Sequence, residues 1–324
     1  MRADLAAAVA AARGGDARAV ARLISLVERG GDGLAELAAL LAADTGRAEV
    51  IGLTGAPGVG KSTTTNELVR ALRAAGRRVG VLAVDPSSPF TGGAILGDRV
   101  RMQDHATDSG VFIRSMSSRG HLGGLAAATP MAVRVLEAAG CDVVLVETVG
   151  VGQAEVEIAS LADTTIVLLA PGMGDAIQAV KAGILEVADI FVINKADRDG
   201  ADVTYRDIQG AIALGERAPG DWRPPVLRTV AARAEGMDDI LAALGKHRAW
   251  LVEHDVLARR RRERAEVEIG RIALGRLRAR LEAVTGDAGL PALAAEVADG
   301  AADPYTAAAK LLAALDRRAD GDHR

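Results

Sequence analysis

Aromatic side chains are scarce in this chain of 324 residues, because Phe, Trp and Tyr together make up only 2% of the sequence. Hydrophobic residues nevertheless make up 49%, so a sizeable core must be built from Leu, Val, Ile and Ala. The chain has one cysteine, Cys141, which excludes an intramolecular disulfide and fits a reducing compartment. Its simplest interpretation is a small buried residue beside a strand.

Long apolar runs are also missing, since no stretch of about 18 apolar residues occurs that could span a bilayer. The Ala-rich N-terminus is interrupted by Arg13 and Asp16, which favours an amphipathic helix over a signal peptide. The net charge of −4 and the pI of about 5.8 give no general attraction to nucleic acid or acidic membranes. We therefore expect neither a nucleic-acid partner nor a membrane partner.

Short β-branched runs recur through the middle of the chain, and helical segments separate most of them. Near-continuous apolar strands that alternate with helices predict an α/β fold with a mostly parallel central sheet, covered by helices on both faces. Such sheets bind ligands at the carboxyl ends of their strands. The predicted strands are 49–55, 78–85, 110–115, 142–148, 164–170, 189–195 and 224–230.

Helical sequence flanks this region on both sides. We predict four parts: an N-terminal helical extension over 1–45, an α/β domain over 46–254, a C-terminal helical arm over 255–318 and a frayed tail over 319–324. The start of the arm is rich in arginine, which suits an anionic partner or, more simply, a solvated helix face. Residues spaced alternately by three and four then form a heptad seam: Val267, Gly270, Leu274, Leu277, Leu281 and Val284.

A phosphate-binding loop is indicated by GAPGVGKS, which matches GxxxxGK[ST] between a predicted strand and a predicted helix. The backbone N–H groups of such a loop surround phosphates, and the helix N-terminus adds the positive end of its dipole. We expect Lys61 to reach the β- and γ-phosphates and Ser62 to ligate Mg²⁺. The predicted nucleotide contacts are Gly55, Ala56, Pro57, Gly58, Val59, Gly60, Lys61, Ser62 and Thr63.

The base specificity is predicted by NKAD, residues 194–197, which follows a predicted strand. The carboxylate of Asp197 can accept hydrogen bonds from the ring N–H and the 2-amino group of guanine. Adenine offers neither donor, and an unpaired charged acceptor costs about 1–3 kcal/mol or more. The stem of Lys195 can cover the base, and Asn194 can brace neighbouring loops. The nucleotides are therefore expected to be GTP and GDP.

A second base-binding loop is predicted at Ala231, Ala232 and Arg233, after the last predicted strand. GTPases often place Ser-Ala in such a loop, where a backbone N–H contacts the base carbonyl. Ala in place of Ser preserves a backbone contact but removes a side-chain contact.

The predicted strand 142–148 ends at Glu147-Thr148-Val149-Gly150, where a typical GTPase has Asp-x-x-Gly. We expect Glu147 to coordinate Mg²⁺ through a water, and the Gly150 N–H to meet the γ-phosphate. Val151 occupies the position at which many signalling GTPases carry a water-positioning Gln, so slow intrinsic hydrolysis is expected.

Further candidates lie in two other loops that follow strands. Asp85 and Asp98 are candidate contacts to Mg²⁺ or its waters, with a helix N-cap as the alternative for Asp98. Lys181, at the end of a Gly-rich loop, is either a surface charge or a cation that stabilises the transition state of hydrolysis. The catalytic candidates are thus Lys61, Asp98, Glu147 and Lys181, and the metal candidates are Ser62, Asp85, Asp98 and Glu147.

Several motifs taken together resemble the MeaB/MMAA family, also called ArgK-type: GAPGVGKST, VDPSSPFTGGAILGDRVRM, SSRGHLGG, ETVGVGQAE, NKAD and DPYTAAAKLL. The resemblance covers residues from about 20 to 315. It implies a SIMIBI-class P-loop GTPase that serves as a chaperone of an adenosylcobalamin-dependent acyl-CoA mutase, most simply methylmalonyl-CoA mutase. It also implies a cytoplasmic homodimer with a C-terminal dimerisation arm, and switch loops that sense the mutase.

Two other functions compete with the chaperone hypothesis. The older ArgK label suggests a kinase or ATPase linked to basic amino-acid transport, which NKAD disfavours. A targeting GTPase of the signal-recognition type needs a Met-rich domain, and six Met residues cannot supply one. Direct carriage of a transition metal is disfavoured because one Cys and five scattered His show no metal-ligand spacing.

Overall fold

The computed structural model describes residues 2–31, 33–85, 105, 107–117, 128–148, 154–172, 184–215, 218, 220–285 and 288–321. Its centre is a seven-stranded sheet in the order β3-β2-β4-β1-β5-β6-β7, and every pair of neighbouring strands in it is parallel. The prediction of a parallel α/β fold is confirmed. The strands are β1 Glu49–Thr54, β2 Val79–Asp85, β3 Val111–Ser117, β4 Val143–Glu147, β5 Thr164–Leu169, β6 Ile190–Ile193 and β7 Val226–Arg228.

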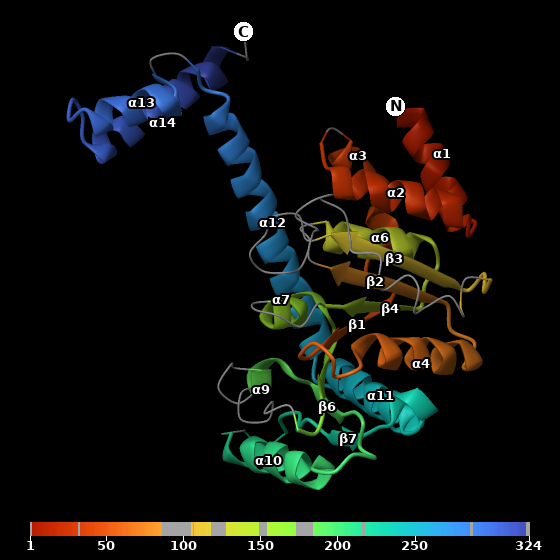
Figure 1. Ribbon diagram of the computed structural model, residues 1–324. Coiled ribbons are helices and arrows are strands. Elements are labelled where there is room, and N and C mark those ends of the chain that lie inside the picture. The colour runs from red at the N-terminus through yellow and green to blue at the C-terminus, as the bar shows by residue number, and fades with distance from the viewer. Residues whose placement is uncertain are drawn as a thin grey trace. The chain divides into compact units, whose positions relative to one another are not determined.

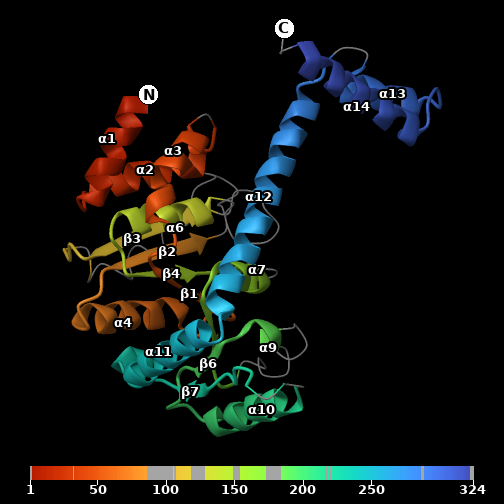
Figure 2. The same ribbon diagram turned by 180° about the vertical axis from the view of Figure 1, so that it is seen from behind.

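Helices cover both faces of the sheet (Figure 1, and from behind in Figure 2). Side chains alternate across β1, so Val50 packs on one face while Ile51 and Leu53 pack on the other. The first face is covered by α1 (Arg2–Arg13), α2 (Ala17–Arg29), α3 (Leu34–Leu41), α6 (Thr129–Ala138) and α7 (Ala154–Leu161). The second is covered by α4 (Lys61–Ala74) and α11 (Met237–Glu253). Helix α10 (Ala201–Leu214) packs on β6 and β7, and the short α9 spans Ile184–Val187.

The N-terminal helices share the core of the sheet. Leu23 and Ile24 of α2 and Leu37 of α3 are fully buried in the same cluster as Leu136 of α6. The segment predicted as an extension over 1–45 is therefore one layer of the α/β unit.

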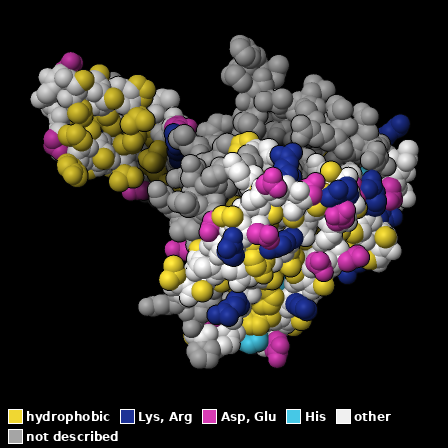
Figure 3. All heavy atoms as spheres, turned by 60° about the horizontal axis from the view of Figure 1, so that its bottom comes forward, with side chains coloured by type: hydrophobic (Ala, Val, Ile, Leu, Met, Phe, Trp, Pro, Cys, Tyr) yellow, Lys and Arg dark blue, Asp and Glu magenta, His cyan; other side chains and the backbone are white. Residues whose placement is uncertain are grey.

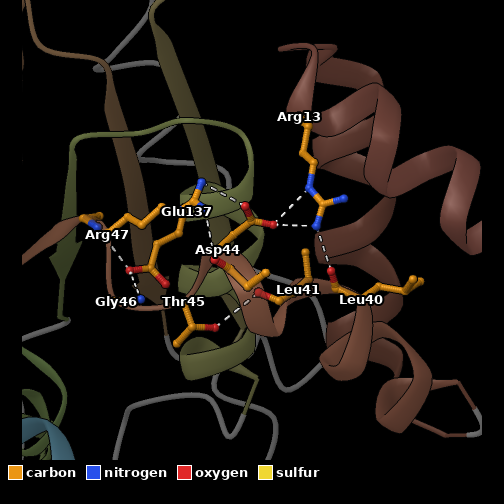
Figure 4. Close-up of polar contacts among 10 residues, drawn as sticks. Arg13, Leu40, Leu41, Asp44, Thr45, Gly46, Arg47 and Glu137 are labelled. Atoms are coloured by element: carbon orange, nitrogen blue, oxygen red, sulfur yellow. Dashed lines mark hydrogen bonds and ion pairs between the residues drawn. The ribbon is translucent and has the colours of Figure 1, made fainter.

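Polar bonds fix the chain where it passes from these helices into β1 (Figure 4). The 3₁₀ turn η1 (Ala42–Asp44) carries a buried carboxylate on Asp44. Arg13 of α1 donates to it at 2.7 and 3.0 Å, and Arg47 lies 3.0 Å from its other oxygen. On α6, Glu137 accepts the N–H groups of Gly46 at 2.9 Å and Ala48 at 3.2 Å. The entry into β1, and hence into the phosphate loop, is thus held from two helices.

The chain divides into two compact units, Met1–Ala258 and Arg259–Arg324. The second contains most of α12 (Val256–Glu282), together with α13 (Leu290–Ala298) and α14 (Pro304–Gly321). Helix α14 extends three residues into the segment predicted as a tail from residue 319. Figure 3 shows hydrophobic side chains gathered over α13 and α14, where Leu290 and Leu312 are exposed.

The predicted heptad seam is covered only at its C-terminal end. Val284 is buried with Ala314 and Leu315 of α14, and Leu281 packs against them. Val267 and Leu274, by contrast, are 58% and 68% exposed. Across the parts of the chain that are described, no helix is both long and apolar enough to cross a membrane.

Candidate nucleotide-binding site

The site lies at the carboxyl ends of the strands, where β1, β4, β6 and β7 each lead into a predicted motif. β1 lies between β4 and β5, and the strand order continues outward from it on both sides, to β2 and β3 beyond β4 and to β6 and β7 beyond β5. Open parallel sheets bind their ligands in the crevice at such a switch point.

The phosphate loop runs from Gly55 to Gly60 and leads directly into α4. Gly55 has φ +142°, and a Cβ there would lie 2.2 Å from the backbone oxygen of Leu168 in β5. Gly60 has φ +100°, and its Cβ would lie 2.3 Å from Nδ2 of Asn194. Glycine is required at both positions, because the loop is pressed against neighbouring strand ends.

Helix α4 begins at Lys61 with no capping side chain on Gly60. An uncapped helix N-terminus offers N–H groups and a positive dipole end to an anion. The buried ammonium of Lys61 donates to the backbone oxygens of Gly55 at 2.8 Å and Ala56 at 3.1 Å. The cation is therefore folded over the loop that would enclose a phosphate. Within the loop Pro57 is exposed, as is Thr63 in the first turn of α4.

Glu147, the last residue of β4, is buried beside the first turn of α4. Ser62 donates its hydroxyl to Oε1 of Glu147 at 2.7 Å, and Thr65 lies 2.9 Å from Oε2. Hydroxyl and carboxylate oxygens are the hard donors that Mg²⁺ prefers. The pair fits a magnesium site in which Ser62 is the ligand and Glu147 holds the ligand's proton.

Thr65 belongs to none of the nucleotide-binding motifs that the sequence predicts. The available signal is its position, three residues after Ser62, which places both hydroxyls on one face of the helix. Its partner is 82 residues away in the sequence, so the contact itself is a product of the fold.

The base motif follows β6 and is bonded to the phosphate loop. Asn194, which is 3% exposed, donates from Nδ2 to the Val59 oxygen at 2.8 Å. Its Oδ1 accepts the N–H of Ala231 at 3.0 Å and the hydroxyl of Thr229 at 3.2 Å. Lys195 has φ +56° and donates from Nζ to the Gly58 oxygen at 2.6 Å. Asn194 thus joins the base motif to the phosphate loop and to residues 229–231, and the side chain of Lys195 extends across the phosphate loop.

Asp197 carries the carboxylate predicted to read guanine, and its side chain is 43% exposed. Arg233, in the turn η3 (Ala231–Arg233), places Nη2 3.5 Å from Asp197 and Nε 3.0 Å from Glu235. The backbone N–H groups of Ala231 and Arg233 are bonded to Asn194 and Val230. Neither bond involves the N–H of Ala232, so this is the N–H group of the turn that suits a contact with the base.

The structure does not describe the side chains of several predicted site residues. Asp98, Gly150 and Lys181 lie outside the described residues, as does Val151. Asp85 ends β2, but only its backbone is described. Among the residues that are described, no group of three or more His, Cys, Asp or Glu side chains forms a metal-binding cluster.

Comparison with known proteins gives a consistent result. The family model described as methylmalonyl Co-A mutase-associated GTPase MeaB matches residues 20–285. A protein of Pyrococcus abyssi named as a GTPase is 48% identical over 301 residues, covering 92% of this chain and 93% of that protein. The mouse mitochondrial methylmalonic aciduria type A homolog is 39% identical over 221 residues, covering 67% of this chain and 53% of that protein.

A solved structure also matches almost end to end. The crystal structure of a LAO/AO transport system kinase superposes with a TM-score of 0.71 at 30% identity, covering 97% of this chain and 98% of that one. The family match spans the phosphate loop, Glu147, the base motif and η3, all the elements that meet at the carboxyl ends of the strands. This chain belongs to the MeaB family of P-loop GTPases.

Proposed function

We propose that this site binds GTP and GDP together with Mg²⁺ and hydrolyses GTP. The observation that carries the proposal is the pair of bonds from the base motif to the phosphate loop, Asn194 to Val59 and Lys195 to Gly58. These bonds join the phosphate loop and the predicted guanine-binding motif into one site, although the bonded residues are 135 or more positions apart in the sequence. When bound, Mg²⁺ neutralises phosphate charge, and Ser62 and Glu147 are the described residues suited to hold it.

Guanine selectivity is tested by Asp197→Asn. An amide can pair with the additional carbonyl of xanthine but offers guanine one mismatched donor, so GDP affinity should fall at least about tenfold, or 1.4 kcal/mol, while xanthosine diphosphate affinity rises. Calorimetric titration of both nucleotides measures this. The matched control is Asp199→Asn, which removes the same charge from an exposed residue nearby and should change neither affinity. Unchanged GDP binding in Asp197→Asn would contradict guanine reading by this carboxylate.

Hydrolysis is slow in the isolated protein and faster with a partner. The support is Val151, which replaces the water-positioning Gln of many signalling GTPases. Lys181 then acts as the cation that a partner moves into place. Lys181→Ala should leave nucleotide affinity and slow turnover unchanged, but lower stimulated turnover by about tenfold or more, or 1.4 kcal/mol upward. Lys61→Ala, in contrast, should impair binding and both rates. Full stimulation of Lys181→Ala would rule out this role.

The partner is an adenosylcobalamin-dependent acyl-CoA mutase, with methylmalonyl-CoA mutase as the first candidate, and the nucleotide state controls the loading and protection of its cofactor. The support is the description of the matching family as mutase-associated and the name of the mouse relative. Co-purification with the mutase, followed by a GTPase assay of the pair, tests it. If no complex forms, the alternative is a nucleotide-dependent kinase or ATPase linked to basic amino-acid transport, as the name of the similar structure suggests.

The protein acts as a cytoplasmic homodimer that pairs through residues 255–318. Exposed apolar side chains on α12 support pairing, because a helix otherwise rich in Arg and Glu gains little from leaving them in water. They are Val267, Ile269, Ile272, Leu274 and Leu277. The cytoplasmic location is what the family resemblance implies.

A further inference from the structure

Both carboxylate oxygens of Glu147 are held by hydroxyls on the same helix. Ser62 lies 2.7 Å from Oε1, and Thr65 lies 2.9 Å from Oε2. Ser62 and Thr65 are three residues apart on α4, so their side chains lie on one helix face. The carboxylate therefore bridges two successive positions of that face.

The proton of the Thr65 hydroxyl has two acceptors within reach, Oε2 of Glu147 and the Lys61 oxygen at 3.0 Å. The Lys61 oxygen already accepts the backbone N–H of residue 65 in the regular helix pattern. A carboxylate is the stronger acceptor of the two, since bonds to an ionised oxygen are about twice as strong as neutral ones. The hydroxyl proton therefore goes to Glu147.

Burial makes this contact matter. Thr65 is 0% exposed and Glu147 is 5% exposed, so water does not replace the bond if the hydroxyl is removed. A carboxylate held at one oxygen can turn about its terminal bond, whereas one held at both oxygens keeps Oε1 against Ser62. Ser62 then keeps its proton directed at Glu147 and its lone pairs available to a cation.

We infer that Thr65 is a positioning residue for the magnesium site: through Glu147 it fixes the Ser62 hydroxyl in the orientation that binds Mg²⁺. The inference rests on the proposed nucleotide site. Partners of metal ligands typically contribute 10–100-fold to metal affinity. Thr65 lies in α4, outside both the phosphate loop and the base motif, so its effect should be confined to the cation.

The test uses the full-length protein and Thr65→Val, which keeps the shape of the side chain and removes the hydroxyl. The rate of mant-GDP dissociation is measured against free Mg²⁺ concentration, and mant-GDP affinity is measured separately in EDTA. The Mg²⁺ midpoint should rise about tenfold, while affinity in EDTA stays within about twofold of the wild type. Thr65→Ser restores the hydroxyl and should return the midpoint to the wild-type value.

Thr64→Val is the matched control. Thr64 is equally buried, and its hydroxyl has no hydrogen-bond partner among the described residues, so the midpoint should not move. An unchanged midpoint in Thr65→Val, or equal shifts in the Val and Ser variants, would overturn the inference. If Thr65→Val does not fold, Thr65→Ala is the second variant without a hydroxyl and is judged by the same criteria. Failure of the wild type to bind mant-GDP would instead refute the proposed function.

Discussion

The substitution Asn194→Ala should uncouple the base motif from the phosphate loop. The amide of Asn194 bonds to Val59, Thr229 and Ala231 at 2.8, 3.2 and 3.0 Å. Thr229 and Ala231 are 1% and 2% exposed, so water cannot take over these bonds. The orphaned N–H of Ala231 alone costs about 1–3 kcal/mol, and the two remaining bonds bring the total loss of unfolding free energy to about 3 kcal/mol.

The assay is thermal unfolding of the nucleotide-free protein, followed by GDP titration. For a unit of this size each kcal/mol lowers Tm by about 2–4 °C, so Tm should fall by roughly 6–12 °C. GDP affinity should fall at least about tenfold, because the loop and η3 lose their common anchor. Thr229→Val removes one of the three bonds and should cost about 1 kcal/mol. A Tm decrease below about 2 °C together with unchanged GDP affinity would refute the reasoning.

Three further predictions address other parts of the chain. Burial raises the pKa of the Glu49 carboxyl, because it disfavours the charged form in the folded protein. The contribution of this group to stability is therefore complete below its unfolded pKa and is lost as the pH rises through its folded pKa. Glu49→Gln should therefore gain stability relative to wild type as the pH rises above the ordinary Glu pKa of 4.5, and a difference in urea midpoint that does not change with pH would contradict it. Burial raises the pKa of the Cys141 thiol to about 12. The native protein should therefore not react with DTNB at about pH 8, but should react after unfolding in urea. Fast labelling of the native protein would instead show an exposed thiolate. Deleting residues 255–324 should leave a monomer by light scattering, and a surviving dimer would place the interface in the α/β unit.

The inner strands are predictable from sequence because each is buried on both faces and so needs a nearly uninterrupted apolar run. β4 and β5, for example, are buried at every position. The place of the N-terminal helices is not predictable in the same way. The pattern of α2 reveals an apolar face, but it does not tell which surface covers that face, and the structure shows α6 and the sheet. The sequence therefore predicts the N-terminal helices but not the surface that they cover, because amphipathicity is local and packing is not.

The same distinction applies to the site. The phosphate loop and NKAD are contiguous motifs whose chemistry follows from residue type and spacing. The bonds of Thr65 to Glu147 and of Arg233 to Asp197 join segments that only the strand order brings together. Arg233 illustrates the point, since the sequence assigns it a backbone contact and the structure adds a guanidinium beside the predicted guanine-reading carboxylate.

The end of β4 is fixed at two successive residues, and this limits where a partner can act. Glu147 is held by Ser62 and Thr65, and the hydroxyl of Thr148 donates to that of Thr54 at the end of β1, at 2.9 Å. Both residues are almost fully buried, and the N–H of Thr148 also bonds to the Leu53 oxygen. A displacement of Glu147 and Thr148 would break buried bonds to β1 and α4, and so would disturb the metal site and the phosphate loop together. A partner that changes hydrolysis without releasing nucleotide is therefore expected to act away from the end of β4, and it can do so while the phosphate loop, Glu147 and the base motif keep their mutual bonds.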